Sequence, residues 1–115
     1  LGDVYKRQGL VTEKPKEDTI DGLKIKVRLL TKDDIKERNL PKNTTGLVIT
    51  EIDKDSPVNY LQVNNIIVEA QKKKINTIGD LDNIVKLALK SNDKSLLIAI
   101  YNNNNQRRYI GVKLN

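Results

Sequence analysis

The chain of 115 residues contains no cysteine, histidine, methionine, tryptophan or phenylalanine. Without cysteine it has neither a disulfide scaffold nor a zinc site with thiolate ligands. Without histidine it cannot assemble a Ser-His-Asp or Cys-His catalytic system, and its three serines have no such base to activate them. We therefore predict that the chain by itself is not an enzyme and uses no metal or other cofactor.

Long apolar runs are also missing, because no stretch approaches the roughly 20 residues that a membrane-spanning helix needs. A length of 115 residues suits one small domain, whose core is feasible without disulfides. The lack of any methionine leads us to expect that the sequence is a piece of a longer or processed protein.

The formal net charge of +6 raises nucleic acid as a partner. However, sixteen lysines stand against five arginines, acidic residues are interleaved with them, and four tyrosines are the only aromatic residues. Specific readout of phosphates and bases favours arginine, and binding to single strands favours aromatic stacking. We expect a solvated basic surface and no nucleic-acid partner, with a basic nucleic-acid-binding domain as an alternative.

The beginning of the chain has no hydrophobic period. We interpret residues 1–8, LGDVYKRQ, as non-native residues derived from an adapter. Residues 9–18 contain Pro15 among lysines and glutamates, a composition typical of a linker. The predicted domain covers residues 19–115.

The rest of the chain is organised around residues 46–70. Residues 47–52 are rich in β-branched and apolar side chains and predict a core strand. Ser56 and Pro57 have the chemistry of a helix start, which predicts a single helical turn over 57–61. After a bend at 63–65, residues 66–70 predict a second apolar strand.

This order resembles the PDZ domains of bacterial HtrA/Deg-type envelope serine proteases. The matching residues are Gly46, Leu47 to Ile49, Asp55, Ser56, Pro57, Leu61, Ile66 and Ile67. The sequence departs from the pattern at Val58, at Asn64 and Asn65 where the family has Gly-Asp, and near Tyr60 where it has glycine. Asparagine tolerates a left-handed backbone, so we expect Asn64 to keep the turn.

An amino-terminal strand is predicted where Leu23, Ile25, Val27 and Leu29 alternate with charged residues. The resemblance implies that this strand and the loop before it form one wall of a peptide groove. In the family, backbone N–H groups of an apolar-Gly-apolar loop hold a C-terminal carboxylate, and the strand pairs with the peptide. Gly22 and Leu23 match this loop.

Asp21 does not match it. A carboxylate beside a site for another carboxylate opposes binding, because like charges repel at close range. The second of two tandem PDZ domains in this family often has an acid here. We therefore interpret the chain as a second PDZ domain with a weak groove for free C-termini, which favours internal segments or a neighbouring domain as occupants.

Two helices are predicted. Thr31 can cap a short helix over 31–40, with Ile35 and Leu40 as its buried contacts. The longest helix is expected over about 79–90, with Ile84 and Leu87 on the sheet and with Leu81 and Val85 facing the groove. The alternative, that all these apolar residues are core, stays open.

The end of the chain predicts a closing hairpin. Its strands are residues 95–101 and 107–114, and the turn over 102–105 is built from asparagines without glycine. Residues 71–74 predict a further hairpin or turn with solvated lysines, and Ile75 returns to the core. The resemblance thus covers about residues 19–114.

We predict a mainly β fold with two helices, a PDZ-like β-sandwich or partly open barrel of the permuted HtrA type. The resemblance implies a peptide-binding module of a periplasmic, homo-oligomeric serine endopeptidase for protein quality control. It would bind extended segments or neighbouring protease or PDZ domains by β-augmentation. A PDZ domain of another envelope protease or of a secretion scaffold is an alternative. The candidate peptide-binding residues are Ile20, Asp21, Gly22, Leu23, Lys24, Ile25, Leu81 and Val85.

Overall fold

The computed structural model describes residues 16–114. Its strands are β1 (Asp18–Ile20), β2 (Ile25–Leu29), β3 (Leu47–Ile52), β4 (Ile66–Ala70), β5 (Lys73–Lys74), β6 (Ser95–Tyr101) and β7 (Arg107–Lys113). The helices are α1 (Lys32–Glu37) and α2 (Ile78–Lys90). The interpretations of residues 1–8 and 9–15 lie outside the described residues, and β1 begins at the last residue of the predicted linker.

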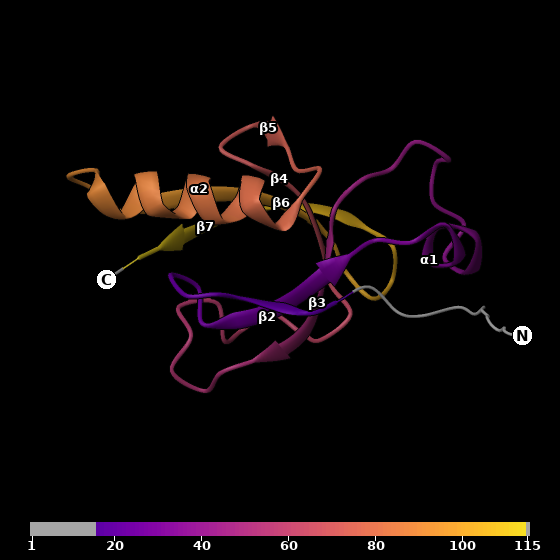
Figure 1. Ribbon diagram of the computed structural model, residues 1–115, viewed down its shortest axis with the longest axis horizontal. Coiled ribbons are helices and arrows are strands. Elements are labelled where there is room, and N and C mark those ends of the chain that lie inside the picture. The colour runs from indigo at the N-terminus through magenta and orange to yellow at the C-terminus, as the bar shows by residue number, and fades with distance from the viewer. Residues whose placement is uncertain (1–15, 115) are drawn as a thin grey trace, which may run out of the picture.

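The strands form one antiparallel sheet in the order β1-β2-β3-β4-β6-β7, with β5 paired to β4. Within residues 16–114, β1 and β7 are not paired with each other, so the sheet is not closed. Figure 1 shows α2 running along one side of the molecule and α1 at the end where β2 leaves the sheet. This architecture confirms the predicted mainly β, PDZ-like open barrel with two helices.

The main hydrophobic core lies between α2 and the sheet. Leu81, Val85 and Ala88 are the buried residues of α2, and the helix contacts β1, β2 and β6. Their spacing of four and three residues places them on one stripe of the helix. This stripe, with the inward residues of the strands, forms a single cluster of buried side chains.

The predicted orientation of α2 is wrong in one respect. Leu87, expected on the sheet, is 66% exposed, and Ile84 is only partly buried at the margin of the core. Leu81 and Val85 are fully buried instead. Each residue turns a helix by about 100°, so Leu87 lies roughly 100° or more around the helix from each residue of the 81-85-88 stripe.

The start of α1 is fixed by reciprocal hydrogen bonds. Asp34 N–H donates to Thr31 Oγ1 (3.1 Å), and Thr31 N–H donates to Asp34 Oδ2 (2.9 Å). Arg28 donates to both carboxylate oxygens of Asp34 (2.7 and 3.1 Å). These Arg28 hydrogen bonds are the main reason that the pKa of Asp34 falls to about 2. Thr31 is the cap that the sequence predicted.

Beyond its start, α1 is shorter than expected and ends at Glu37. Leu40 is buried and Ile35 partly buried, and both pack in a second cluster with Val48, Ile66, Val68, Ala99, Leu30 and Tyr101. The buried contact predicted at Leu40 is therefore confirmed, although Leu40 lies past the last turn of the helix, and Ile35 contacts the same cluster only partly buried.

Two turns have asparagine in the left-handed backbone region. Asn64 and Asn105 have φ angles of 79° and 59°, in the left-handed region. Arg38 joins them, since it donates to Asn64 O (2.7 Å), Asn102 O (2.8 Å) and Asn105 Oδ1 (3.1 Å). The prediction that asparagine keeps these turns is confirmed, whereas the role of Arg38 was not predicted.

Two further turn predictions have different outcomes. Residues 57–61 are not a helix: Asn59 N–H donates to Ser56 O and Leu61 N–H to Val58 O, which makes two overlapping four-residue turns. The hairpin at residues 71–74 is confirmed, with Gln71 and Lys72 at φ angles of 54° and 66°.

Candidate functional site

The structure brings the predicted peptide-binding residues together where β1, the following turn, β2 and α2 meet. Five of them are essentially fully buried in the main core: Ile20, Leu23, Ile25, Leu81 and Val85. Of the others, Gly22 is half-buried, and the side chains of Asp21 and Lys24 are exposed. The predicted set is therefore contiguous, with an apolar interior and a charged exterior.

A tight hairpin supplies most of this site. Thr19 pairs with Lys26 and Ile20 with Ile25, and residues 21–24 form the turn. Leu23, predicted as the start of the strand, lies in this turn instead. The period-2 pattern extended to Leu23 because the turn also directs this side chain into the core. Lys24 adopts φ 52°, a conformation uncommon for a residue other than glycine or asparagine.

β2 has a paired strand on each side. Ile25, for example, is opposite Ile20 of β1 and Ile52 of β3. The peptide pairing that the resemblance implies for this strand would need a free edge, and from Ile25 to Val27 that edge is already paired with β1. The edge strand is β1, and both β1 and β2 contact α2.

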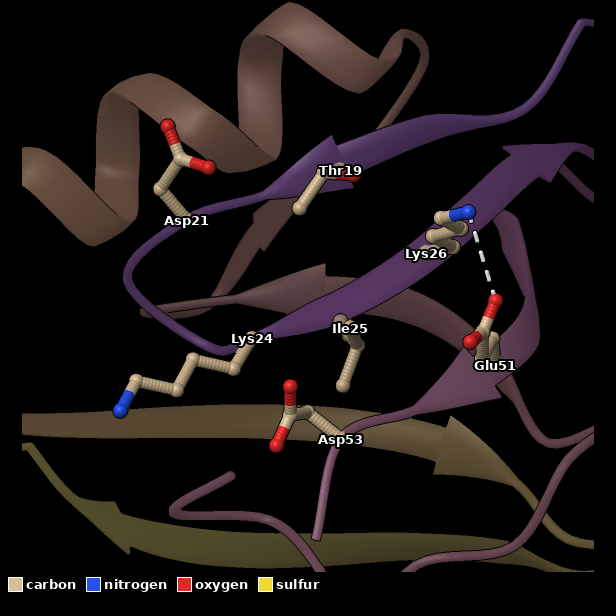
Figure 2. Close-up of a pocket in the computed structure, with 7 residues that line it drawn as sticks. All are labelled: Thr19, Asp21, Lys24, Ile25, Lys26, Glu51 and Asp53. Carbon is tan, nitrogen blue, oxygen red and sulfur yellow. Dashed lines mark ion pairs between the residues drawn. The ribbon is translucent and has the colours of Figure 1, made fainter. Parts of the chain in front are cut away.

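We use the name slot for the space between β2 and α2, and β1 occupies it. Figure 2 shows β1 between α2 and β2, consistent with its pairing to the strand and its contacts with the helix. Ile20 is the one buried residue of β1, whereas Asp18 and Thr19 are exposed. The slot thus holds an extended segment whose aliphatic side chain enters the core.

Two backbone donors of the turn are also in use. Leu23 N–H and Lys24 N–H both donate to Ile20 O, at 3.0 and 2.8 Å. The resemblance assigns the N–H groups of this loop to a C-terminal carboxylate. In the described structure the carbonyl of Ile20 accepts from two of the N–H groups of the turn.

Gly22 allows the turn to approach α2 closely. A Cβ at this position would lie 2.3 Å from Val85 Cγ1 and 3.0 Å from Leu89 Cδ1, shorter than van der Waals contact. The requirement is steric, because the φ angle of Gly22 is not in the left-handed region. A glycine here keeps the turn packed on the helix.

Ser56 holds the turn by a hydrogen bond from outside the hairpin. Its hydroxyl donates to Leu23 O and accepts from Val58 N–H (3.0 Å), and its side chain is buried. Asp53 N–H adds a hydrogen bond to Lys24 O (3.0 Å). Sequence reasoning identified Ser56 only as a local cap, because its distant partner, Leu23, gives no signal in the sequence.

We expect Ser56→Ala to lower the free energy of unfolding by about 1–3 kcal/mol, because it leaves a buried carbonyl and a buried N–H without their partner. Urea denaturation measures this loss, and amide hydrogen exchange should increase at residues 21–24. Ser95→Ala is the control, since Ser95 is exposed and its removal should change stability by about 0.5 kcal/mol or less. Equal effects of the two substitutions would contradict this role of Ser56.

The outer face of the hairpin carries a shallow depression of about 290 Å³. It is lined by Thr19, Asp21, Lys24, Ile25, Lys26, Glu51 and Asp53. Figure 2 shows these residues, with Lys26 Nζ and Glu51 Oε1 paired at 3.4 Å. Both lysines and carboxylates surround the depression, so its charges largely compensate one another.

Asp21 is directed toward α2 in Figure 2. On that helix, Lys86 Nζ pairs with Asp82 Oδ2 at 2.9 Å. The hydrogen bond to Asp82 is the main reason that the pKa of Lys86 is raised, and the charges of Asp82 and Asp21 add to it. The repulsion of a ligand carboxylate by Asp21 stays a prediction.

Other kinds of site have less support in residues 16–114. No group of three aspartate or glutamate side chains in this range is arranged to hold a metal ion. Neither α1 nor α2 is long and apolar enough to cross a membrane. The slot can hold an extended chain by strand pairing and by burial of an aliphatic side chain.

Comparisons with known proteins agree with this description of the fold. No protein-family model matches the chain, and no match was found among curated proteins. A solved structure described as "HtrA-type protease AlgW with decapeptide" is similar, with a TM-score of 0.61 and 19% sequence identity. The similarity covers 80% of this chain and 28% of that chain. The chain therefore shares the fold of about a quarter of an HtrA-type protease.

Proposed function

We propose that the chain is a non-catalytic PDZ-type module of an HtrA/Deg-like serine endopeptidase. The observation that carries the proposal is the slot, where an extended segment pairs with β2 and buries Ile20 against the core. This is the geometry of β-augmentation, in which backbone pairing supplies affinity and a side-chain pocket supplies selectivity. The fold shared with an HtrA-type protease supports the same assignment.

In this proposal, the parent protein cleaves misfolded proteins in the periplasm with a catalytic triad in another domain. The chain, as the second PDZ domain, engages extended polypeptide segments or joins protomers of a homo-oligomer. A membrane span and a nucleic-acid partner are not part of the proposal. Sequence of the parent gene upstream of Leu1 tests the assignment: a domain with a Ser-His-Asp triad supports it, and a different domain favours another envelope protease or a secretion scaffold.

A peptide titration tests the binding role. The AlgW structure was described with a decapeptide, so a decapeptide with several aliphatic residues is a suitable probe. Titrated into isotope-labelled protein, it should shift the amide resonances of residues 21–27 and 81–89. Shifts confined to other regions, such as β7, would contradict the placement of the site. Steep, salt-dependent binding of duplex DNA would instead favour the nucleic-acid alternative.

The role of Asp21 is tested with the same probe, prepared with a free or an amidated C-terminus. Asp21→Leu should raise the affinity for the free carboxylate severalfold and leave the amidated peptide unchanged, because only the first carries the repelled charge. Asp33→Leu on the exposed side of α1 is the matched control for loss of one acid. Equal gains for both peptides would contradict the repulsion argument.

A further inference from the structure

We propose that β1 is an intramolecular ligand of the slot and that any external segment must displace it before it binds. This inference rests on the proposed function. It also defines the ligand: an internal extended segment with an aliphatic side chain in the position of Ile20, for which a free C-terminus is not required.

The first argument is that β1 makes the backbone contacts expected of a bound peptide. Its residues Asp18, Thr19 and Ile20 pair antiparallel with Val27, Lys26 and Ile25. Added strands bind by this same ladder of N–H and C=O groups. While β1 is in place, the edge of β2 from Ile25 to Val27 is occupied and cannot pair with a second strand.

The second argument is that Ile20 occupies the end of the slot. Its side chain is fully buried in the cluster that also contains Leu81 and Val85. Its carbonyl oxygen accepts from Leu23 N–H and Lys24 N–H. The chain continues through Asp21 and turns away, so the slot accepts a residue in the middle of a chain at the place where a terminal carboxylate would sit.

The third argument is that β1 is attached weakly enough to be displaced. It is three residues long, and Ile20 is its only buried side chain. Before it, the described attachment is one hydrogen bond between exposed side chains, from Thr50 Oγ1 to Glu17 Oε1 (2.7 Å). Short, exposed edge segments with few buried contacts open at low free energy, whereas the core strands do not. A ligand that pairs over more residues than β1 can therefore compete.

Competition by a tethered segment lowers the apparent affinity, since only the fraction of molecules with an empty slot can bind. The proposal therefore predicts weak binding by the unmodified chain, stronger binding when β1 is loosened, and none when β1 is fixed. These three levels distinguish it from a peptide site elsewhere on the domain.

A reversible crosslink is the decisive experiment. Thr19 and Lys26 are directly opposite and both exposed, and the chain has no native cysteine, so Thr19→Cys with Lys26→Cys gives a single pair across β1 and β2. The probe is a fluorescein-labelled decapeptide with the sequence of residues 13–22. We expect oxidation to reduce its affinity at least tenfold and reduction to restore it.

Ser95→Cys with Lys113→Cys is the matched control, because this directly opposite, exposed pair joins β6 and β7 away from the slot. Oxidation there should leave binding unchanged. A probe with aspartate in place of its isoleucine should not bind either form. Ile20→Ser, which loosens β1, should bind the original probe at least tenfold more tightly than the unmodified chain. If this variant does not fold, the crosslink result alone decides.

The outcomes separate this inference from the proposed function. Equal binding by the oxidised and reduced Thr19/Lys26 pair overturns the inference and leaves a peptide-binding module with its site elsewhere. If no form binds the probe, including the reduced Thr19/Lys26 pair and Ile20→Ser, both the inference and the proposed function are overturned. Loss of binding only in the oxidised Thr19/Lys26 pair supports both.

Discussion

Leu81→Ala is expected to lower the free energy of unfolding by about 2–5 kcal/mol, the range for large-to-small substitutions in a packed core. Leu81 is fully buried in the first turns of α2, in the cluster that contains Ile20 and Leu23. The substitution removes the apolar contacts and leaves a cavity that the sheet and helix cannot fully close. Urea denaturation followed by circular dichroism measures the change.

Leu87→Ala is the control within the same helix. Leu87 is 66% exposed, so its truncation removes little buried area and should change stability by about 0.5 kcal/mol or less. Both substitutions replace leucine with alanine in the same helix, so they change the helix propensity by the same amount. A loss at Leu87 as large as that at Leu81 would mean that α2 packs with its other face on the sheet.

This pair of residues shows how far the sequence determines α2. The position and length of the helix are predicted well, because Thr77 and Asp80 form the capping box and the apolar period is clear. The buried face is not determined, since apolar residues cover a wide arc of the helix. Only packing against β1, β2 and β6 selects the stripe of Leu81, Val85 and Ala88.

The candidate site shows the same limit more strongly. The sequence identified the residues that meet there, and the structure places all eight at one junction. It did not predict that Asp18, Thr19 and Ile20 form a strand of their own, because three residues beside a charged linker carry no readable period. Long-range partners, such as Ser56 with Leu23 or Arg38 with Asn64, likewise leave no local signal.

The asparagine turns were predictable for a physical reason. Asn64 and Asn105 occupy left-handed positions that few residues tolerate, so the residue type itself reports the backbone conformation. Lys24 occupies the same region without such a signal. At Lys24, as at Gln71, Lys72 and Lys94, the backbone conformation differs from the local preference of the residue, so tertiary structure must impose it.

Gly46→Ala is expected to lower the free energy of unfolding by about 1–3 kcal/mol, the range for overpacking a core. Gly46 precedes β3, where a Cβ would lie 2.7 Å from the carbonyl oxygen of Ile67. It would also lie 3.1 Å from side-chain atoms of Ile66 and Val68, both buried. A backbone oxygen in a paired strand cannot move aside as a flexible side chain does, so β3 and β4 must separate. Urea denaturation gives the loss.

Gly111→Ala is the control: it is the same chemical change as Gly46→Ala, but it is expected to raise the free energy of unfolding. Gly111 lies within β7, and no atom is within 4 Å of the position its Cβ would take. Alanine there should raise stability by about 0.5–1 kcal/mol, because glycine loses more backbone entropy on folding. A gain at both positions would show that β3 and β4 do not approach as closely as described. A loss at Gly46 alone would show that the close contact between β3 and β4 depends on the absence of a side chain at this position.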